Sequence, residues 1–328
     1  MKAIRRTVTL ICLLCAALQA QRFVAVQRHG IGWKCHGVIW VENSSLFCKD
    51  WQTKELAKLS FDGREIFPKL DPPPVGSAAQ IVGLAEDVSG DIYAVDGNHI
   101  HVYSPQGKYK KTLSPGIQLT FGIVVADPDH IYVSGHSPFK RNDSSASIFV
   151  VGSDGIQRSF STPFFSGRSG LEEFVLNVPG ILALDRSKGL LYQVSPNLYE
   201  IRVFDLQGKP VRTISPPAEY ANRAPQVIHS PQGGVGIGAG DTLDDIAVLS
   251  NGGLAVSGAR LDEEQKDGAK TGDSYTRFLD IYDATGKFLR RFSENGLQLE
   301  GKHLWGIDHH TGRAFFSKGT DALEAEIR

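Results

Sequence analysis

The stretch "VGLAEDVSGDIYAVDGNHIHVYSPQGKYKKTL", from Val82 to Leu113, decides the fold. It holds four short apolar runs separated by polar turns that contain Gly, Asp and Asn, the pattern of consecutive antiparallel strands. The same pattern recurs along the chain at Gly37–Phe67, Phe121–Phe160, Gly180–Ile214 and Asp244–Phe292. Repetition at a period of this size is typical of a fold built from repeated supersecondary units.

The spacing of the turn glycines identifies the unit. Equivalent glycines stand 44, 48, 53 and 78 residues apart, at Gly63, Gly107, Gly155, Gly208 and Gly286. The first three intervals match a four-stranded propeller blade of about 40–50 residues, and the last fits one blade plus an insertion. Seven blades would need a further strand-turn-strand unit between Ile214 and Asp244, where "APQVIHSPQGGVGIGAG" offers only a partial one.

The two ends of the chain predict how the ring closes. The last unit, "LWGIDHHTGRAFFSKGTDALEAEIR", has three strands, and the N-terminal "RFVAVQR" is a strand without a blade. We therefore predict an all-β, six-bladed β-propeller whose last blade is closed by the N-terminal strand, which removes an exposed sheet edge. The alternative is that "ALEAEIR" forms a C-terminal helix, because Ala, Leu and Glu favour helices.

The unit from Val82 to Leu113 resembles an NHL repeat in its order of strand, Gly turn, Tyr-x-x-Asp, Asn and second Gly turn. The chain as a whole is similar to six-bladed propellers of the NHL/TolB-like group. That resemblance implies a structural role for Asp96 and Asn98, which match the positions that close the turn after the second strand. The group includes scaffolds, sensors, lactonase-like hydrolases and a lyase, so the resemblance implies a fold and leaves the activity open.

The N-terminus predicts export. Lys2, Arg5 and Arg6 precede an apolar run from Thr7 to Leu18, and a small-residue cleavage site follows at Ala20. We predict a signal peptide over residues 1–20 and a propeller over residues 21–328, located in the periplasm or outside the cell. A permanent anchor is the alternative, but the run is shorter than the roughly 20 residues that span a bilayer.

The charge and cysteine content of the chain limit the classes of partner and the chemistry that we predict. The formal net charge is −1, with both signs spread along the chain, so nucleic-acid binding is not predicted. No stretch after the signal peptide is long and apolar enough to span a bilayer, so stable membrane insertion is not predicted either. Cys35 and Cys48 remain after the signal peptide and flank "VIWVENSSLF", which favours a disulfide across the first hairpin. A thiol nucleophile or a metal pair is the alternative, without a CxxC or CxxH companion.

Propeller topology places the loops on two faces. Turns that join the first to the second strand, and the third to the fourth, are short and share one face. The other connections share the opposite face and include four long segments: Ser137–Ala146, Ser161–Pro179, Ser215–Leu243 and Leu261–Ser274. Long loops are usually functional or disordered, so we expect this long-loop face to carry the function.

The long segments differ in composition. "RNDSSAS" and the charged "RLDEEQKDGAKTGDSYTR" fit solvated loops as well as binding loops. Ser161–Pro179 carries Phe164, Phe165, Leu171 and Phe174, and is expected to pack over the face or to cover a partner-binding patch.

Catalytic signatures are missing from the sequence: it has no HExxH, P-loop or complete GxSxG, and no CxxC after the predicted signal peptide. His36 and His303, with His136, are candidate metal ligands at strand ends near the axis, although satisfied or surface histidines explain them more simply. A carboxylate ring of Asp50, Asp96, Asp241 and Asp244 is a further possibility for a cation.

The sequence favours a non-enzymatic binding module without a cofactor. Its ligand would be a protein, a peptide or a carbohydrate, contacted by His136, Arg260 and Trp305 on the long-loop face. The alternative is a metal-dependent, lactonase-like hydrolase or lyase with its site in the axial channel.

Overall fold

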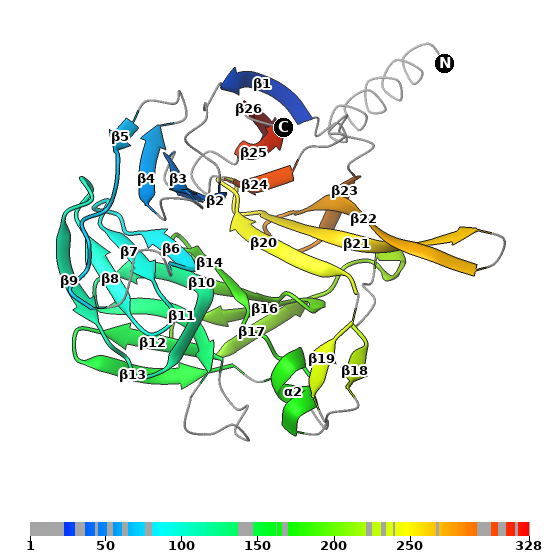
Figure 1. The fold of residues 1–328 in the computed structure, drawn as a ribbon, viewed down its shortest axis with the longest axis horizontal. Coiled ribbons are helices and arrows are strands. Elements are labelled where there is room, and N and C mark those ends of the chain that lie inside the picture. The colour runs from blue at the N-terminus through cyan, green and yellow to red at the C-terminus, as the bar shows by residue number, and fades with distance from the viewer. Residues whose placement is uncertain are drawn as a thin grey trace, which may run out of the picture.

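A computed structural model gives an all-β propeller, in which short antiparallel sheets follow one another around a common centre (Figure 1). The structure describes residues 23–29, 37–42, 45–50, 55–60, 65–75, 81–136, 147–161, 163–165, 170–220, 225–230, 234–238, 240–266, 269–293, 303–307, 313–318 and 321–327. The predicted signal peptide lies outside these residues. No helix within the described ranges is long and apolar enough to cross a bilayer.

Consecutive strands pair to form the sheets. One sheet holds β2 (Gly37–Glu42), β3 (Ser45–Asp50), β4 (Leu56–Ser60) and β5 (Glu65–Phe67). The next holds β6 (Gly83–Glu86), β7 (Ile92–Val95), β8 (Ile100–Tyr103) and β9 (Tyr109–Leu113). It is followed by β10 (Gln118–Asp127), β11 (His130–His136), β12 (Ile148–Gly152) and β13 (Gly155–Phe160). Then come β14 (Ile181–Asp185), β15 (Leu190–Ser195), β16 (Leu198–Asp205) and β17 (Pro210–Ile214). A further sheet holds β20 (Thr242–Val248), β21 (Leu254–Lys266), β22 (Ala269–Tyr282) and β23 (Phe288–Ser293).

The remaining four-stranded sheet joins the two ends of the chain. β1 (Phe23–His29) pairs antiparallel with β26 (Asp321–Ile327), which lies beside β25 (Arg313–Lys318) and β24 (His303–Ile307). The register sets Phe23 opposite Ile327, so the predicted pairing of the N-terminal strand with the last strand is confirmed. The C-terminal helix considered as the alternative is wrong, because the antiparallel ladder with both neighbours satisfies the backbone of β26.

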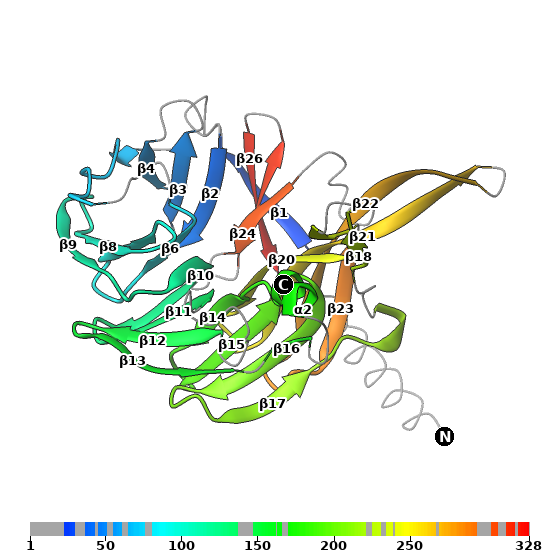
Figure 2. The ribbon, with the colours of Figure 1, turned by 60° about the horizontal axis from the view of Figure 1, so that its bottom comes forward.

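The innermost strands form the centre of the propeller. β2 contacts β6, β6 contacts β10, and the series continues through β14, β20 and β24 back to β2. Figures 1 and 2 show these strands around the middle of the molecule, with the later strands of each sheet farther out.

The sheets are held together by apolar side chains that are buried between neighbouring sheets, and several strands are buried at every position. Tyr93 and Val102, from the β6–β9 sheet, pack in one buried cluster with Ile123 and Val133 from the next sheet. Similar clusters lie between other neighbouring sheets. Such burial stabilises the folded state by about 25 cal/mol for each Å² of apolar surface removed from water. The clusters form only because consecutive sheets pack against each other.

A buried polar network also joins two sheets. The Asp280 carboxylate, fully buried in β22, accepts two hydrogen bonds from the Arg291 guanidinium, each 2.7 Å long. The Tyr199 hydroxyl of β16 donates to the same carboxylate at 2.6 Å. Burial, together with the Asp280 charge, raises the pKa of Tyr199 well above its ordinary value. The guanidinium is sandwiched between the rings of Tyr220 (4.2 Å) and Phe278 (4.0 Å).

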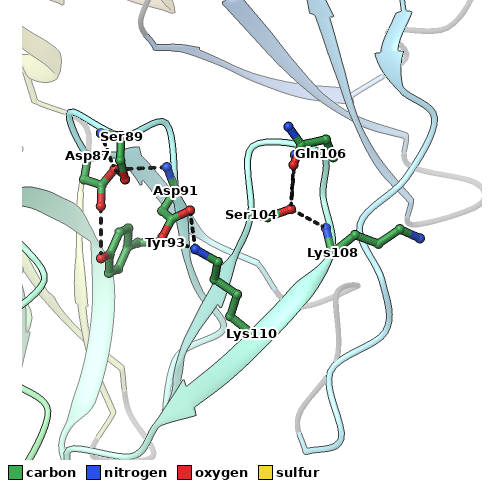
Figure 3. A network of polar contacts seen from close by, with 8 residues as sticks. All are labelled: Asp87, Ser89, Asp91, Tyr93, Ser104, Gln106, Lys108 and Lys110. Atoms are coloured by element: carbon green, nitrogen blue, oxygen red, sulfur yellow. Dashed lines mark hydrogen bonds and ion pairs between the residues drawn. The ribbon is translucent and has the colours of Figure 1, made fainter.

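The short-turn face is built from turns that begin with a capping side chain. The Asp87 carboxylate accepts the backbone N–H of Ser89 at 2.8 Å and of Asp91 at 3.0 Å, and the Tyr93 hydroxyl at 3.3 Å (Figure 3). Lys110 of β9 pairs with Asp91 at 2.7 Å. Asn, Asp and Ser stabilise turns in this way because their side chains replace a backbone acceptor. Equivalent caps stand at Ser104, Asp127, Asp185, Asp205 and Asp283.

One of the four long connections, residues 261–274, is not a loop as expected. Residues 261–274 were expected to form a loop, but β21 and β22 continue through them as a long hairpin. Residues 161–179 contain the helix α2 (Gly170–Leu176), and residues 215–243 contain the 3₁₀ helix η3 (Ala218–Tyr220) with the two-stranded sheet of β18 (Val227–His229) and β19 (Val235–Ile237). Residues 137–146 lie outside the described residues.

Cys48 lies in β3, almost completely buried, and is disulfide-bonded. Cys35 lies outside the described residues, so its pairing with Cys48 stays a prediction.

Candidate binding face

Two insertions of the long-loop face pack against each other. α2 contacts β19, and Glu172 of α2 forms an ion pair with His229 of β18, with 3.1 Å between Oε1 and Nε2. Figure 1 shows the helix beside the small two-stranded sheet. Connections from two different places in the sequence therefore make one surface.

The segment before α2 is fixed to the propeller. The Asn177 side-chain amide accepts the N–H of Phe165 and donates to its carbonyl, both at 2.7 Å. The Arg202 guanidinium of β16 lies over the Phe164 ring at 3.9 Å. Phe164 and Phe165 are half-buried, which agrees with the expectation that this segment packs over the face. The side chains of Leu171 and Phe174 lie outside the described part of the structure.

A two-stranded arm, residues 260–266 and 269–277, extends from the β20–β23 sheet (Figures 1 and 2). β20 pairs with β21 only as far as Ala259, and β23 pairs with β22 only from Phe278. Beyond these positions, the two strands of the arm pair only with each other within the described ranges. An isolated two-stranded ribbon is only marginally stable in water, and proteins normally limit exposed strand edges.

Of the three predicted contact residues, Arg260 has a described side chain, whereas His136 and Trp305 do not. Arg260 lies at the base of the arm, opposite Thr276, and its side chain is exposed. His136 is the last residue of β11, and Trp305 lies at an irregularity between Leu304 and Gly306 in β24. The side chains of His136 and Trp305 lie outside what the structure describes, so their part in binding stays a prediction.

The predicted metal ligands near the axis stay untested. His303 begins the inner strand β24, as expected, but its side chain is not described. His36 lies outside the described residues, directly before the inner strand β2.

Two of the predicted acidic ligands have structural partners. The Asp241 carboxylate accepts the N–H of Leu261 at 2.8 Å and so holds the base of the arm. Asp244 pairs with Arg277 across the sheet at 3.0 Å. The side chain of Asp50 lies outside the described residues.

Asp245 is an acid that sequence reasoning missed. The β20–β21 register shifts between Leu243 and Asp245, so the regular alternation of side chains between the two faces of the sheet is broken there. Burial raises the pKa of Asp245 to about 7, opposed by a hydrogen bond from the Ile246 N–H and reinforced by the neighbouring Asp244 charge. A carboxyl that titrates near neutrality close to the axis can hold or release a proton under working conditions.

Replacing Asp245 by Asn is expected to raise Tm, and to raise it more at pH 8 than at pH 5. The folded protein holds the Asp245 proton more tightly than the unfolded chain, so the associated stability is complete below the ordinary pKa of Asp and is lost as pH rises through about 7. Asn stays neutral and keeps the acceptor for Ile246. Thermal denaturation at the two pH values measures the effect.

The matched control is Asp283→Asn, because hydrogen bonds from Thr285 lower the pKa of Asp283. This variant is expected to lose stability at pH 8. An Asp245→Asn chain whose Tm at pH 8 equals that of the wild type would show that Asp245 is ionised freely in the folded protein.

Asp96, another of the predicted acidic ligands, lies at the turn between β7 and β8, together with two histidines. The Asp96 carboxylate accepts the N–H of Asn98 at 3.1 Å and of His99 at 2.8 Å, which confirms that it closes this turn. Its other contacts are with two imidazoles, His99 Nδ1 at 3.1 Å and His101 Nε2 at 3.0 Å. Burial opposes ionisation of Asp96, but the hydrogen bonds from Asn98, His101 and His99 prevail and lower its pKa.

Comparison with known proteins identifies the fold. No known protein family matches the sequence, and no curated protein matches it. A member of the DUF4221 family from Bacteroides vulgatus has a similar structure (TM-score 0.63, 8% identity), with 94% of this chain and 98% of that one covered. A protein from Bacteroides fragilis that is named as exported gives a TM-score of 0.51 at 12% identity, covering 94% of both chains.

A gluconolactonase from Xanthomonas campestris is also similar, with a TM-score of 0.50 and 15% identity over 89% of this chain and 87% of that one. At such low identities a similarity reports architecture and not activity. The resemblance to the NHL/TolB-like group stays a prediction. The structural neighbours are β-propeller proteins, and this chain has the β-propeller fold.

Proposed function

We propose that this chain is an exported six-bladed propeller of the NHL/TolB-like kind that works as a non-enzymatic binding module through its long-loop face. The blade number rests on the four-stranded sheets and on the contacts that lead from β2 around to β24. Export rests on the N-terminal basic and apolar pattern and on the disulfide at Cys48, since disulfides persist in oxidising compartments.

The observation that carries the proposal is the contrast between the faces. The short-turn face consists of tight turns closed by their own Asp and Ser side chains, such as Asp87 and Asp283. The long-loop face carries the arm and the packed insertions, which add surface that the propeller core does not need. Binding sites are concentrated on such loops, held by a rigid scaffold.

The arm favours a protein or peptide ligand over a carbohydrate. In the described part of the arm, neither strand pairs with a third strand, so an extended segment can add a strand at its outer edge. Tyr275 on the arm and Ile228 on β18 are about half exposed, at 46% and 55%. Exposed aromatic and apolar side chains on a polar surface are typical of protein-binding patches.

A second candidate is a hydrolase or lyase with its site on the inner strand β20. Asp245 favours it, because a carboxyl with a pKa of about 7 suits general acid-base catalysis.

The experiment that tests the proposed binding function places a photo-crosslinking residue on each face of the propeller in turn and identifies the face that captures the ligand.

A further inference from the structure

We propose that Asp96, His99 and His101 form a site for a divalent metal ion of the zinc class, away from the axis, at the turn between β7 and β8. One ligand atom from each residue can be chosen so that all three lie within 4.8 Å of one another. His101 Nε2 lies 3.0 Å from Asp96 Oδ2, and His99 Nδ1 lies 3.1 Å from Oδ1. Ligand atoms around a tetrahedral zinc ion are about 3.3 Å apart, given bonds of about 2.0–2.1 Å.

The local sequence explains why the three groups meet. His99 directly precedes β8 and His101 is the second residue of β8, so with extended backbone their side chains project to the same face of the sheet. Their rings stack with 5.7 Å between centroids. The Asp96 carboxylate is turned toward them because two backbone N–H groups of the turn fix it.

A supporting layer holds the inner histidine. His101 is fully buried, and its Nδ1 lies 2.9 Å from Thr112 Oγ1, which in turn lies 2.9 Å from the Tyr109 hydroxyl. Metal-binding histidines commonly donate their second N–H to such a partner, which sets the tautomer and the ring orientation. Without metal, His101 Nε2–H donates to the Asp96 carboxylate. A metal ion would replace this proton, and Nδ1–H would then donate to Thr112.

Solvent reaches the cluster from one side. The His99 side chain is 26% exposed, whereas those of Asp96 and His101 are 2% and 0% exposed. Three protein ligands with one accessible side leave a coordination position for water or for a group from a ligand.

The chain contains a matched turn that lacks the second imidazole. On the short-turn face, His130 Nδ1 lies 2.9 Å from both carboxylate oxygens of Asp127, with the same three-residue spacing. Two residues farther on, Tyr132 replaces the second histidine, and its hydroxyl donates to the Leu206 carbonyl at 3.0 Å. A turn of the Asp-x-x-His type therefore closes without a second histidine. The buried His101 imidazole is the feature that distinguishes the Asp96 turn as a metal site.

The test is zinc binding by the mature chain after removal of bound metal with a chelator. Isothermal titration with Zn²⁺ is expected to show one binding event in the wild type and in His130→Ala. In His99→Ala this event should weaken at least 10-fold. The exposed His99 is chosen because replacing the buried His101 risks unfolding. Zinc should also raise Tm in the wild type and in His130→Ala but not in His99→Ala, since an ion that binds only the folded state stabilises it.

The proposal is overturned by any of three results: a wild-type chain that binds no zinc, equal zinc affinity in wild type and His99→Ala, or equal weakening in His99→Ala and His130→Ala. Co²⁺ provides an independent signature, because its visible absorption reports tetrahedral coordination. That absorption should be present in His130→Ala and absent in His99→Ala.

Discussion

A chain that begins at Gly30, and so lacks β1, is expected to lose cooperative folding of the whole propeller. β1 contributes six register pairs to β26, from Phe23–Ile327 to His29–Ala322. Each net hydrogen bond contributes about 1 kcal/mol, so the loss is on the order of the entire stability of a domain, about 5–15 kcal/mol. Removal also exposes the edge of β26 to pairing with other molecules.

Near-UV circular dichroism during thermal denaturation measures this effect, with a chain that begins at Gln21 as the control. The control is expected to show one sharp transition, and the shortened chain a broad or absent one together with aggregation. A shortened chain that melts at the temperature of the control would show that β1 does not close the propeller.

Replacing Asp280 by Ala is expected to lower the free energy of unfolding by about 3–5 kcal/mol. The substitution leaves the Arg291 guanidinium, with its side chain only 10% exposed, without its bidentate partner. It also removes the acceptor of the Tyr199 hydroxyl, which itself accepts a hydrogen bond from Tyr282 at 3.0 Å. Urea denaturation measures the change.

Asp283→Ala is the matched control for the buried carboxylate. Asp283 stands three residues later, at the turn into β23, where it caps the turn by accepting from Thr285 and Lys287. Its loss is expected to cost about 1 kcal/mol, as for an exposed hydrogen bond. Equal losses in the two variants would contradict the account of Asp280 as the centre of a buried network.

The repeat makes most of the fold predictable. The unit Val82–Leu113 coincides with the sheet from Gly83 to Leu113, because both the alternation and the turn residues are local signals. The arm was missed because its polar sequence lacks the apolar alternation of a half-buried strand. Asp267-Gly268 is the available signal, since Asp-Gly is a favoured two-residue hairpin turn.

The candidate site is less predictable from sequence. Sequence reasoning placed metal ligands at the axis, in His36 and His303, whereas the described cluster of Asp96, His99 and His101 is local to one turn. The signal "DGNHIH" was present, with two histidines at strand spacing after an aspartate. Asp245 could not be found in this way, because a register shift and burial by neighbouring sheets determine its environment.

The most direct test of the central claim, that the long-loop face binds the ligand, is crosslinking from one face at a time. A photo-crosslinking amino acid is placed at position 260, where Arg260 is exposed at the base of the arm, or at position 154, where Asp154 is exposed in the turn between β12 and β13. After irradiation in cells that produce the protein, position 260 is expected to give a discrete adduct and position 154 none. Adducts from position 154 alone, or equal adducts from both, would contradict the account.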